Sequence, residues 1–230
     1  MPYNVLLIGF EDCEHCKRAQ HLLESKEFKV TTAWTSRDRR TPSSGKIETW
    51  KGDYIFHLKS YCILPKTVLD SAAHGAINFH PSPPRYPGSG GINWGLYNKD
   101  TTSGVTVHYM NQKIDNGDII SFHPVPVFVD DDVESLLTRV HIEQYNAFES
   151  VVNAICEHGP RYLKDKSNIY SGEPWGPKLG RIKDIDSLQK ITADIGKEEL
   201  DRRIRATAFG KFGPNLVIHG KTFKYTGEET

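Results

Sequence analysis

Side chains with complementary chemistry lie near the ends of two segments of this sequence. Asn78 and His80 close the run GAINFH, and alternate side chains of an extended segment share a face, so both point the same way before Pro81 stops the strand. A carboxamide can donate a hydrogen bond to a developing oxyanion, and a neutral imidazole can accept a proton from an attacking nucleophile. The pair predicts an acyl-type transfer site, whereas either residue by itself is more often a hydrogen-bonded structural side chain.

A second segment, GVTVHYMNQKIDNGDII at residues 104–120, supplies acids for the same chemistry. Asp115 and Asp118 lie in its last turn, and turn aspartates commonly bond their own backbone. Asp115 could instead orient His80 and stabilise its charge during proton transfer, while Asn78 holds the oxyanion. The two segments together therefore predict one site with a base, an acid and an oxyanion donor.

Runs with strand character alternate with helical segments and position these residues. This alternation predicts α/β layers. The loop PSPPRYPGSGG at residues 81–91 follows the Asn78 strand; proline fixes its course, glycine lets a ligand approach its backbone, and the first amides of the next helix could bind an anion. The predicted strands are Asn4–Phe10, Lys29–Trp34, Tyr54–Leu58, Ala76–Phe79, Val105–Met110 and Ile119–Val127, and the predicted helices are Glu14–Ser25, Pro65–Ala73, Gly91–Asn98 and Val133–His158.

The helix over Val133–His158 has the clearest pattern, with apolar residues at spacings of three and four. Asp131 and Glu134 fit a capping-box variant at its start, and Gly159-Pro160 closes it. The stretch YSGEPWGPKLG, rich in Gly and Pro, indicates a surface connector and a domain boundary. The predicted parts are a catalytic domain over 1–168, a connector over 169–180 and a small C-terminal region over 181–230, with a helix at Lys197–Ala208 and a hairpin of Leu216–His219 and Thr222–Tyr225 that turns at Gly220-Lys221.

Composition and charge exclude several classes of protein. The 29 basic and 29 acidic residues cancel, so no overall field attracts nucleic acid or an anionic membrane. No apolar stretch approaches the roughly 20 residues that cross a bilayer, and the start MPYNVLLIGF lacks a cationic leader. Cys13, Cys16, Cys62 and Cys156 are too scattered for a disulfide scaffold. We expect a cytoplasmic protein with no nucleic-acid or membrane partner.

Several segments together resemble the folate-dependent formyltransferases, which include glycinamide ribonucleotide, methionyl-tRNA and sugar-nucleotide formyltransferases. The similarity lies in ILP at 63–65, INFHPS with its RYPG loop, and GVTVH leading to the ID-G turn. It implies a Rossmann-like domain with a mixed, mostly parallel sheet, a catalytic set of Asn78, His80 and Asp115, and 10-formyltetrahydrofolate as formyl donor without a metal. The residues implied to receive the pterin of the folate are Tyr61, Cys62, Leu64, Met110, Asn111, Lys113 and Ile114.

The substrate within that family is a narrower prediction. After its first strand the chain reads GFEDCEHCK, where glycinamide ribonucleotide formyltransferases carry a glycine-rich phosphate loop. Methionyl-tRNA formyltransferases are expected to carry a basic C-terminal domain for the tRNA phosphates, whereas this charge-balanced chain has about 50 residues after the connector. The chain is most similar to short N-formyltransferases that modify a nucleotide-linked 4-amino sugar, with dTDP-4-amino-4,6-dideoxyglucose favoured, for surface glycans such as the O-antigen of lipopolysaccharide. UDP- and GDP-linked sugars remain alternatives. The residues expected to contact the sugar nucleotide are Ser82, Arg85, Tyr86, Gly88 and Trp94, and core packing is a competing role for Trp94.

The same short relatives imply a homodimer joined through the C-terminal hairpin, since an exposed hairpin edge favours pairing.

Two other classes of function compete with formyl transfer. Cys13-Glu14-His15-Cys16 follows a strand and opens a helix, as in thioredoxin-like redox proteins, and with His15 it could be part of a metal site that lacks a fourth ligand. A binding module that keeps the pocket without the reaction is the third class, and the intact set of Asn78, His80 and Asp115 argues against it.

Overall fold

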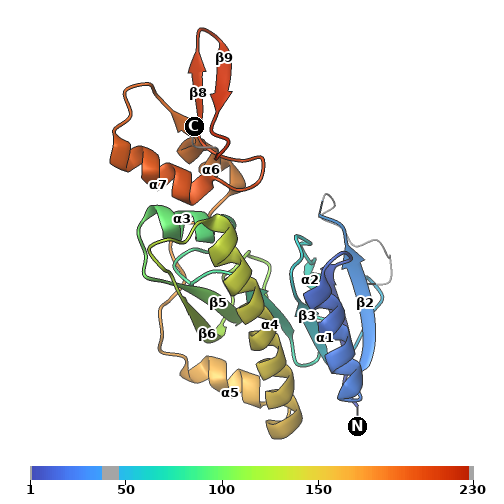
Figure 1. The fold of residues 1–230 in the computed structure, drawn as a ribbon. Coiled ribbons are helices and arrows are strands. Elements are labelled where there is room, and N and C mark those ends of the chain that lie inside the picture. Colours follow the sequence, from blue (N-terminus) through green and yellow to red (C-terminus); the bar gives the residue numbers. More distant parts are fainter. Residues whose placement is uncertain (1, 38–46, 228–230) are drawn as a thin grey trace. The chain divides into compact units, whose positions relative to one another are not determined.

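The computed structural model describes residues 2–37 and 47–227, and the chain packs as two compact units (Figure 1). Unit 1 is formed by Met1–His80, Val105–His123 and Glu143–Glu173, and unit 2 by Pro81–Gly104, Pro124–Ile142 and Pro174–Thr230. The last crossing between them, at Glu173–Pro174, lies within the predicted connector over 169–180. Because the chain also crosses twice in each direction before that point, the division into domains at 168 and 181 stays a prediction.

A mixed sheet carries the candidate residues. Its strands are β1 (Asn4–Phe10), β2 (Lys29–Thr35), β3 (Tyr54–His57), β4 (Ala76–His80), β5 (Thr102–Tyr109) and β6 (Ile119–Pro126), in the order β2-β1-β3-β4-β5-β6. Parallel pairs join β1 to β2, β1 to β3 and β3 to β4, whereas β4 and β5 are antiparallel. The predicted α/β fold with a mostly parallel sheet is confirmed.

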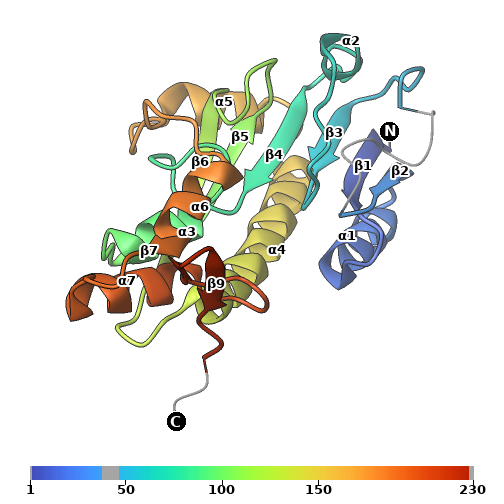
Figure 2. The ribbon, with the colours of Figure 1, turned by 90° about the horizontal axis from the view of Figure 1, so that it is seen from above.

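The helices are divided between the two units. They are α1 (Glu14–Ser25), α2 (Lys66–Leu69), α3 (Gly91–Tyr97), α4 (Val133–His158), α5 (Tyr162–Ile169), α6 (Ile182–Gln189) and α7 (Lys197–Thr207). Figure 2 shows α1 lying beside β1 and β2 at one side of the sheet. Across the described part of the chain, none of these helices is both long and apolar enough to cross a bilayer.

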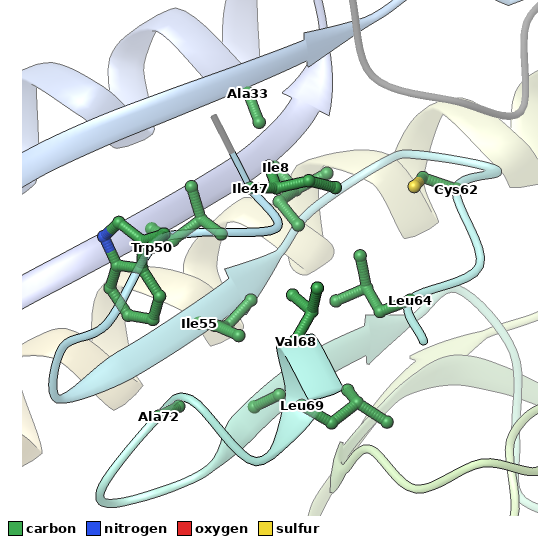
Figure 3. Packing of buried hydrophobic residues seen from close by; sticks show 12 residues of the cluster. Ile8, Ala33, Ile47, Trp50, Ile55, Cys62, Leu64, Val68, Leu69 and Ala72 are labelled. Atoms are coloured by element: carbon green, nitrogen blue, oxygen red, sulfur yellow. The ribbon is translucent and has the colours of Figure 1, made fainter. Parts of the chain in front are cut away.

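One face of the sheet is covered by α2 through a buried apolar cluster (Figure 3). Val68 and Leu69 of the helix lie over Ile55 of β3 in this cluster, and Met110 packs against it from outside. The cluster consists of Leu6, Ile8, Ala33, Ile47, Trp50, Ile55, Cys62, Leu64, Val68, Leu69, Ala72 and Ala76. Burial of this much apolar surface fixes the segment from Cys62 to Leu64 against the sheet.

The opposite face packs against α4. The ring of Phe148 meets Phe56 of β3 and Phe79 of β4 edge-on, with ring centroids 5.5 and 5.4 Å apart. Because successive side chains of a strand point to opposite faces, Asn78 and His80 lie on the face away from Phe148. The alternation expected from GAINFH therefore places this pair together on one side of the sheet.

The start of α4 corrects the predicted cap. Asp132 Oδ1 accepts a hydrogen bond from the Ser135 amide at 2.8 Å, and Ser135 Oγ accepts one from the Asp132 amide at 3.1 Å. This reciprocal pair is a capping box one residue later than the predicted Asp131–Glu134 pair, which was wrong. Asp131 instead accepts a hydrogen bond from Arg139 Nη1 at 2.7 Å, because the arginine two turns along the helix competes for its carboxylate.

The helix predicted over Pro65–Ala73 is shorter than expected and spans only Lys66–Leu69. The chain leaves the helical path because the Ala73 amide donates to the Gly52 carbonyl at 2.9 Å, a partner on the neighbouring segment. A hydrogen bond to a segment far away in sequence thus replaces the next turn of the helix. Local sequence patterns do not contain that information.

In unit 2, α7 packs against α3. Tyr97 Oη donates to Glu199 at 2.9 Å, and Arg202 donates from Nε and Nη2 to the Tyr97 carbonyl at 3.1 and 2.9 Å. Asn93 Nδ2 donates to the Ala206 carbonyl at 2.7 Å. These bonds tie the C-terminal region to the helix that follows the loop over residues 81–90.

Unit 2 also contains a small sheet in the order β7-β8-β9, formed by β7 (Lys190–Ile191), β8 (Asn215–Ile218) and β9 (Lys221–Lys224). The predicted hairpin is present, but its two-residue turn is His219-Gly220 and not Gly220-Lys221. Both turn residues have positive φ, 48° and 77°, as a type I′ turn requires. The pairing of β8 with β9 sets this register, and α5, α6 and β7 were not predicted.

Candidate active site

Three neighbouring strands bring histidines and an asparagine into one row. In the sheet, His57 of β3 is paired with Asn78 of β4, and Asn78 is paired with His108 of β5. His80 lies two residues further along β4, on the same face as Asn78. The sequence analysis missed His57 and His108. The signal was present, since the apolar runs YIFH, INFH and VTVH each end in histidine.

The loop after β5 carries Asp115 toward this row. Asp115 has a φ of 41°, in the left-handed region, and a Cβ on the nearby Gly117 would lie 1.8 Å from the Tyr109 carbonyl oxygen. Only glycine therefore allows the loop to fold back so closely on the end of β5. A hydrogen bond from the Tyr109 amide to the Asp118 carbonyl, at 2.9 Å, closes the loop.

The structure brings the three predicted catalytic residues together. The Asp115 carboxylate lies 3.3 Å from His80 Nδ1 through Oδ2, and its Oδ1 accepts from Asn78 Nδ2 at 3.2 Å. All three residues belong to unit 1, and the side chains of His80 and Asp115 are only 7% and 8% exposed. A carboxylate held against an imidazole in this way orients the ring and stabilises the imidazolium that proton transfer creates.

Asp118 occupies a different environment, although it is three residues away. Its side chain is 66% exposed and pairs with Lys164 of α5 at 3.0 Å. This surface ion pair contributes little stability and leaves Asp118 outside the buried row. The geometry therefore favours Asp115 over Asp118 as the acid of the site.

His108 adds a second imidazole to the carboxylate. Its Nδ1 lies 2.8 Å from the Tyr109 carbonyl, which can only accept, so Nδ1 carries a proton. Its Nε2 lies 3.0 Å from Asn78 Nδ2 and 3.2 Å from Asp115 Oδ1. With Nδ1 directed at the Tyr109 carbonyl, the ring presents Nε2 to both Asn78 and Asp115, so His108 helps to hold these two side chains in place.

His57 lies on the other side of Asn78. Its Nδ1 is 3.2 Å from Asn78 Oδ1, and its Nε2 is 3.0 Å from the Cys62 carbonyl. Burial lowers the pKa of His57 below its ordinary value of 6.5, although the hydrogen bonds to Asn78 and to Cys62 oppose the shift. The ring is therefore held in its neutral form in the folded protein near pH 7.

We expect the His57→Gln variant to lose part of the acid sensitivity of the fold. The unfolded chain binds a proton at His57 near pH 6.5 that the folded chain resists, so stability is present above that pH and is lost as the pH falls, by about 1.4 kcal/mol for each unit between the two pKa values. Denaturant unfolding of both proteins between about pH 7.5 and pH 5 measures this. Parallel stability profiles for variant and wild type would contradict the assignment.

The residues implied to receive a pterin lie on two loops of unit 1. Cys62 and Leu64 are buried in the cluster below the sheet face, and Met110 packs against that cluster, so these three are brought together. Tyr61 lies edge-on to Phe10 with ring centroids 5.1 Å apart. The residues of this set with exposed side chains are Tyr61, Asn111, Lys113 and Ile114.

The residues expected to contact a sugar nucleotide all belong to unit 2. Arg85 donates from Nε to Asp100 at 3.1 Å and from Nη2 to the Thr102 carbonyl at 2.7 Å, and Tyr86 Oη donates to Asp100 at 2.9 Å. Trp94 lies on α3 with its ring edge-on to Tyr97, which is the packing role weighed against substrate contact.

The two smaller residues of that set lie where the loop is closely packed. Ser82 is buried, and a Cβ on Gly91 would lie 1.8 Å from its Oγ. Gly88 has a φ of 87° and bridges to Gly180, so the end of the connector lies along this loop. Within residues 2–37 and 47–227, no group of three or more His, Cys, Asp or Glu side chains is arranged to hold a metal ion.

Residues 7–152, more than half of the chain, match the family model for formyl transferase, and they include Asn78, His80 and Asp115. The chain belongs to the formyl transferase family. The resemblance predicted from the ILP, INFHPS and ID-G segments is confirmed. This is a family of enzymes, and the residues of the row lie inside the matched part.

Curated relatives of this formyl transferase family member include methionyl-tRNA formyltransferases. That of Syntrophus aciditrophicus is 50% identical over 163 residues, which are 70% of this chain and 49% of the relative. That of Geobacter sulfurreducens is 38% identical over 103 residues, which are 44% of this chain and 32% of the relative. The chain thus spans about half or less of the length of these relatives.

Solved structures share the fold over nearly the whole chain. A 4-N formyltransferase from Francisella tularensis matches with a TM-score of 0.77 at 20% identity, covering 98% of this chain and 97% of that one. A sugar N-formyltransferase from Shewanella matches with a TM-score of 0.71 at 20% identity, covering 96% of both chains. An N-formyltransferase from Helicobacter canadensis, in complex with folinic acid and dTDP-3-aminofucose, matches with a TM-score of 0.66 at 17% identity, covering 90% of this chain and 80% of that one. These likenesses establish the formyltransferase fold.

Proposed function

We propose that this protein transfers the formyl group of 10-formyltetrahydrofolate to the amine of a nucleotide-linked 4-amino-4,6-dideoxy sugar, with dTDP-4-amino-4,6-dideoxyglucose as the favoured acceptor. The observation that carries the proposal is the contact of one buried carboxylate, Asp115, with both His80 and Asn78. This arrangement joins a general base to an oxyanion donor, which is what transfer of an acyl-type group to an amine requires. Synthesis of a surface glycan such as O-antigen is the proposed use of the product.

The proposed mechanism assigns one task to each side chain. The folate supplies the electrophilic formyl carbon. Asn78 exchanges one of its two Nδ2 contacts, that to Asp115 or that to His108, for the oxygen that becomes negative when the amine attacks, and His80 takes the proton that the amine loses. Asp115, which faces His80 Nδ1, keeps the ring oriented and stabilises its charge, so the proton is taken up at Nε2.

The two loops of unit 1 carry both apolar and polar side chains, as recognition of a pterin requires. Buried Leu64 belongs to the apolar cluster and half-buried Met110 packs against it, and the side chains of Tyr61 and Ile114 are exposed on the same two loops. Lys113 and the amide of Asn111 supply polar groups on the same loop. We propose that these residues, with Cys62, hold the pterin.

The acceptor part of the proposal is supported by the extent of the fold likeness. The fold likeness extends to α7 and the β7-β8-β9 sheet, because the matches to the Francisella and Shewanella enzymes cover 98% and 96% of this chain. The loop that begins at Ser82 follows directly on the strand of His80. We propose that Ser82, Tyr86, Gly88 and Trp94 contact the sugar nucleotide, and that Arg85 reaches its pyrophosphate by exchanging its present partners.

A second candidate acceptor is methionyl-tRNA. The specific observation in its favour is the 50% identity to the Syntrophus methionyl-tRNA formyltransferase over 163 residues. The chemistry on the formyl group is the same for both acceptors, so Asn78, His80 and Asp115 do not discriminate between them. Only the acceptor tested in the reaction does so.

The experiment is mass spectrometry on reactions with 10-formyltetrahydrofolate and a panel of acceptors. The panel contains 4-amino and 3-amino sugars linked to dTDP, UDP and GDP, and methionyl-tRNA. The His80→Ala variant is the negative control. We expect one nucleotide sugar to gain a formyl group with the wild type only. Formylated methionyl-tRNA would establish the second candidate, and no product from any pair with folded protein would overturn formyl transfer.

We also propose that the protein acts as a homodimer that pairs through the exposed edge of β9. Every residue of Lys221–Lys224 is exposed, and Val217 and Phe223 present apolar side chains on the same hairpin. An unpaired strand edge of this kind favours pairing with a second copy. Light scattering at micromolar concentration tests this, and a monomeric mass would contradict it.

A further inference from the structure

Formyl transfer uses neither Cys13 nor Cys16, yet the two thiols occupy linked positions at the start of α1. Cys13 is the N-cap of the helix, and Cys16 is its third residue. The Cys16 amide donates to the Cys13 carbonyl at 3.0 Å, so the two residues are about one helical turn apart. Both residues are buried free thiols, with Cys13 8% exposed and Cys16 fully buried. The helix therefore begins with two buried thiols on neighbouring turns.

The Cys16 thiol donates to the Leu58 carbonyl, with Sγ 3.4 Å from the carbonyl oxygen. The Cys16 side chain beside it lowers the pKa of Cys13, while the Cys13 side chain and burial raise the pKa of Cys16. The two thiols are thus unequal, with Cys13 the one that ionises.

Positive charge adds to this difference. Lys59, which follows β3, is paired with His15 Nδ1 at 2.9 Å, and its ammonium favours the Cys13 thiolate together with the amides of Cys16 and His15. Among the described residues, the charge of Arg37 also interacts with Cys13. A thiol at a helix start beside cations is in the environment that makes cysteine a nucleophile.

The other two cysteines lack these features and serve as internal references. Cys62 is buried to a similar degree as Cys13, and burial raises its pKa. Cys156 lies exposed on α4. Burial alone therefore does not produce the Cys13 environment.

We propose that Cys13 and Cys16 form a redox-active dithiol that closes to an intrachain disulfide by exchange with a low-molecular-weight disulfide. The Cys13 thiolate attacks one sulfur of that disulfide, a bond forms between the two sulfurs, and one thiolate leaves. Cys16 then gives up its proton and attacks the Cys13 sulfur, which expels the second thiolate. The protein loses two electrons and two protons, and the small disulfide becomes two thiols. This chemistry is independent of formyl transfer.

The experiment equilibrates the Cys156→Ser protein with buffers of reduced and oxidised glutathione, because removal of the exposed thiol prevents disulfides between molecules. After acid quenching, denaturation and alkylation, peptide mass spectrometry counts the remaining thiols. We expect Cys13 and Cys16 to lose alkylation together as the buffer becomes more oxidising, with recovery on reduction, while Cys62 stays alkylated. Retention of both thiols in the most oxidising buffer, or a disulfide that includes Cys62, would overturn the proposal.

Two further variants in the same background test the order of the steps. The Cys16→Ser variant should accumulate a mixed disulfide with glutathione at Cys13, because the resolving thiol is missing. The Cys13→Ser variant should form none at Cys16, which is fully buried and whose pKa is raised. Equal amounts of mixed disulfide in the two variants would contradict the assigned roles. Since the wild-type pair is measured directly, a variant that fails to fold leaves the main test intact.

Discussion

The His80→Ala variant is expected to lose about 10²- to 10⁴-fold in kcat for formyl transfer, because it removes a positioned general base. The ring is buried, and its Nδ1 lies 3.3 Å from Asp115. In the variant, no group from the solvent takes the place of the ring in the same geometry. The residues proposed to bind the two substrates lie on loops and do not include His80, so KM should change much less than kcat. Steady-state kinetics with the acceptor identified by mass spectrometry measures both constants.

A histidine outside the candidate active site provides the matched control for His80→Ala. His123 of β6 pairs with Glu143 of α4 at 3.3 Å and is partly exposed, so His123→Gln should leave kcat unchanged. Circular dichroism and thermal unfolding of both variants separate loss of chemistry from loss of fold. Turnover of His80→Ala close to that of the wild type would remove His80 from the mechanism.

The framework of the site was predictable because short-range patterns encode it. Alternation along GAINFH places Asn78 and His80 on one face, and the structure has them opposite Phe79, which packs on α4. The helix over Val133–His158 appears with its predicted bounds, since its apolar stripe is long and a glycine with positive φ ends it.

The row of His57, Asn78 and His108 was not predictable in the same way. It depends on which strand lies beside which, and on a register that pairs residues 21 and 30 positions apart. Tertiary packing decides which strands pair in the sheet, and no single segment contains that information. Three apolar runs that each end in histidine therefore do not predict that the histidines lie side by side. Asp115 was predictable as an acid of the loop, whereas the fold of the chain decides that it and not Asp118 is buried.

The acceptor is the part of the function that catalytic residues cannot encode. The roles proposed for Asn78, His80 and Asp115 all concern the formyl group and not the acceptor that receives it. Recognition of the amine lies elsewhere, in contacts such as those proposed for Tyr86 and Trp94, and these residues also have packing roles. Sequence relatives and fold relatives therefore point to different acceptors without any conflict about the chemistry.

Replacement of Asp115 by Asn is expected to lower kcat by about 10²- to 10⁴-fold while the protein stays folded. The amide has nearly the shape of the carboxylate but no charge, so the His80 imidazolium that forms during proton transfer loses its counter-ion at 3.3 Å. The same change leaves one acceptor oxygen in place of two, so the new side chain cannot accept from both His80 Nδ1 and Asn78 Nδ2, and one of these two groups is then less well oriented. The loss should appear in kcat, since neither effect contributes to binding of the substrates.

The control for this change lies three residues away. Asp118→Asn removes the same charge from the same loop, but its side chain is 66% exposed and pairs with Lys164 on the surface, so kcat should stay within about threefold of the wild type and stability within about 0.5 kcal/mol. Comparing the two variants in one assay separates the buried carboxylate from the general charge of the loop. Equal losses in both would mean that the loop acts through its overall charge, and a loss confined to Asp118→Asn would transfer the role to that residue. A loss confined to Asp115→Asn is the outcome that the contacts of Asp115 with His80 and Asn78 require.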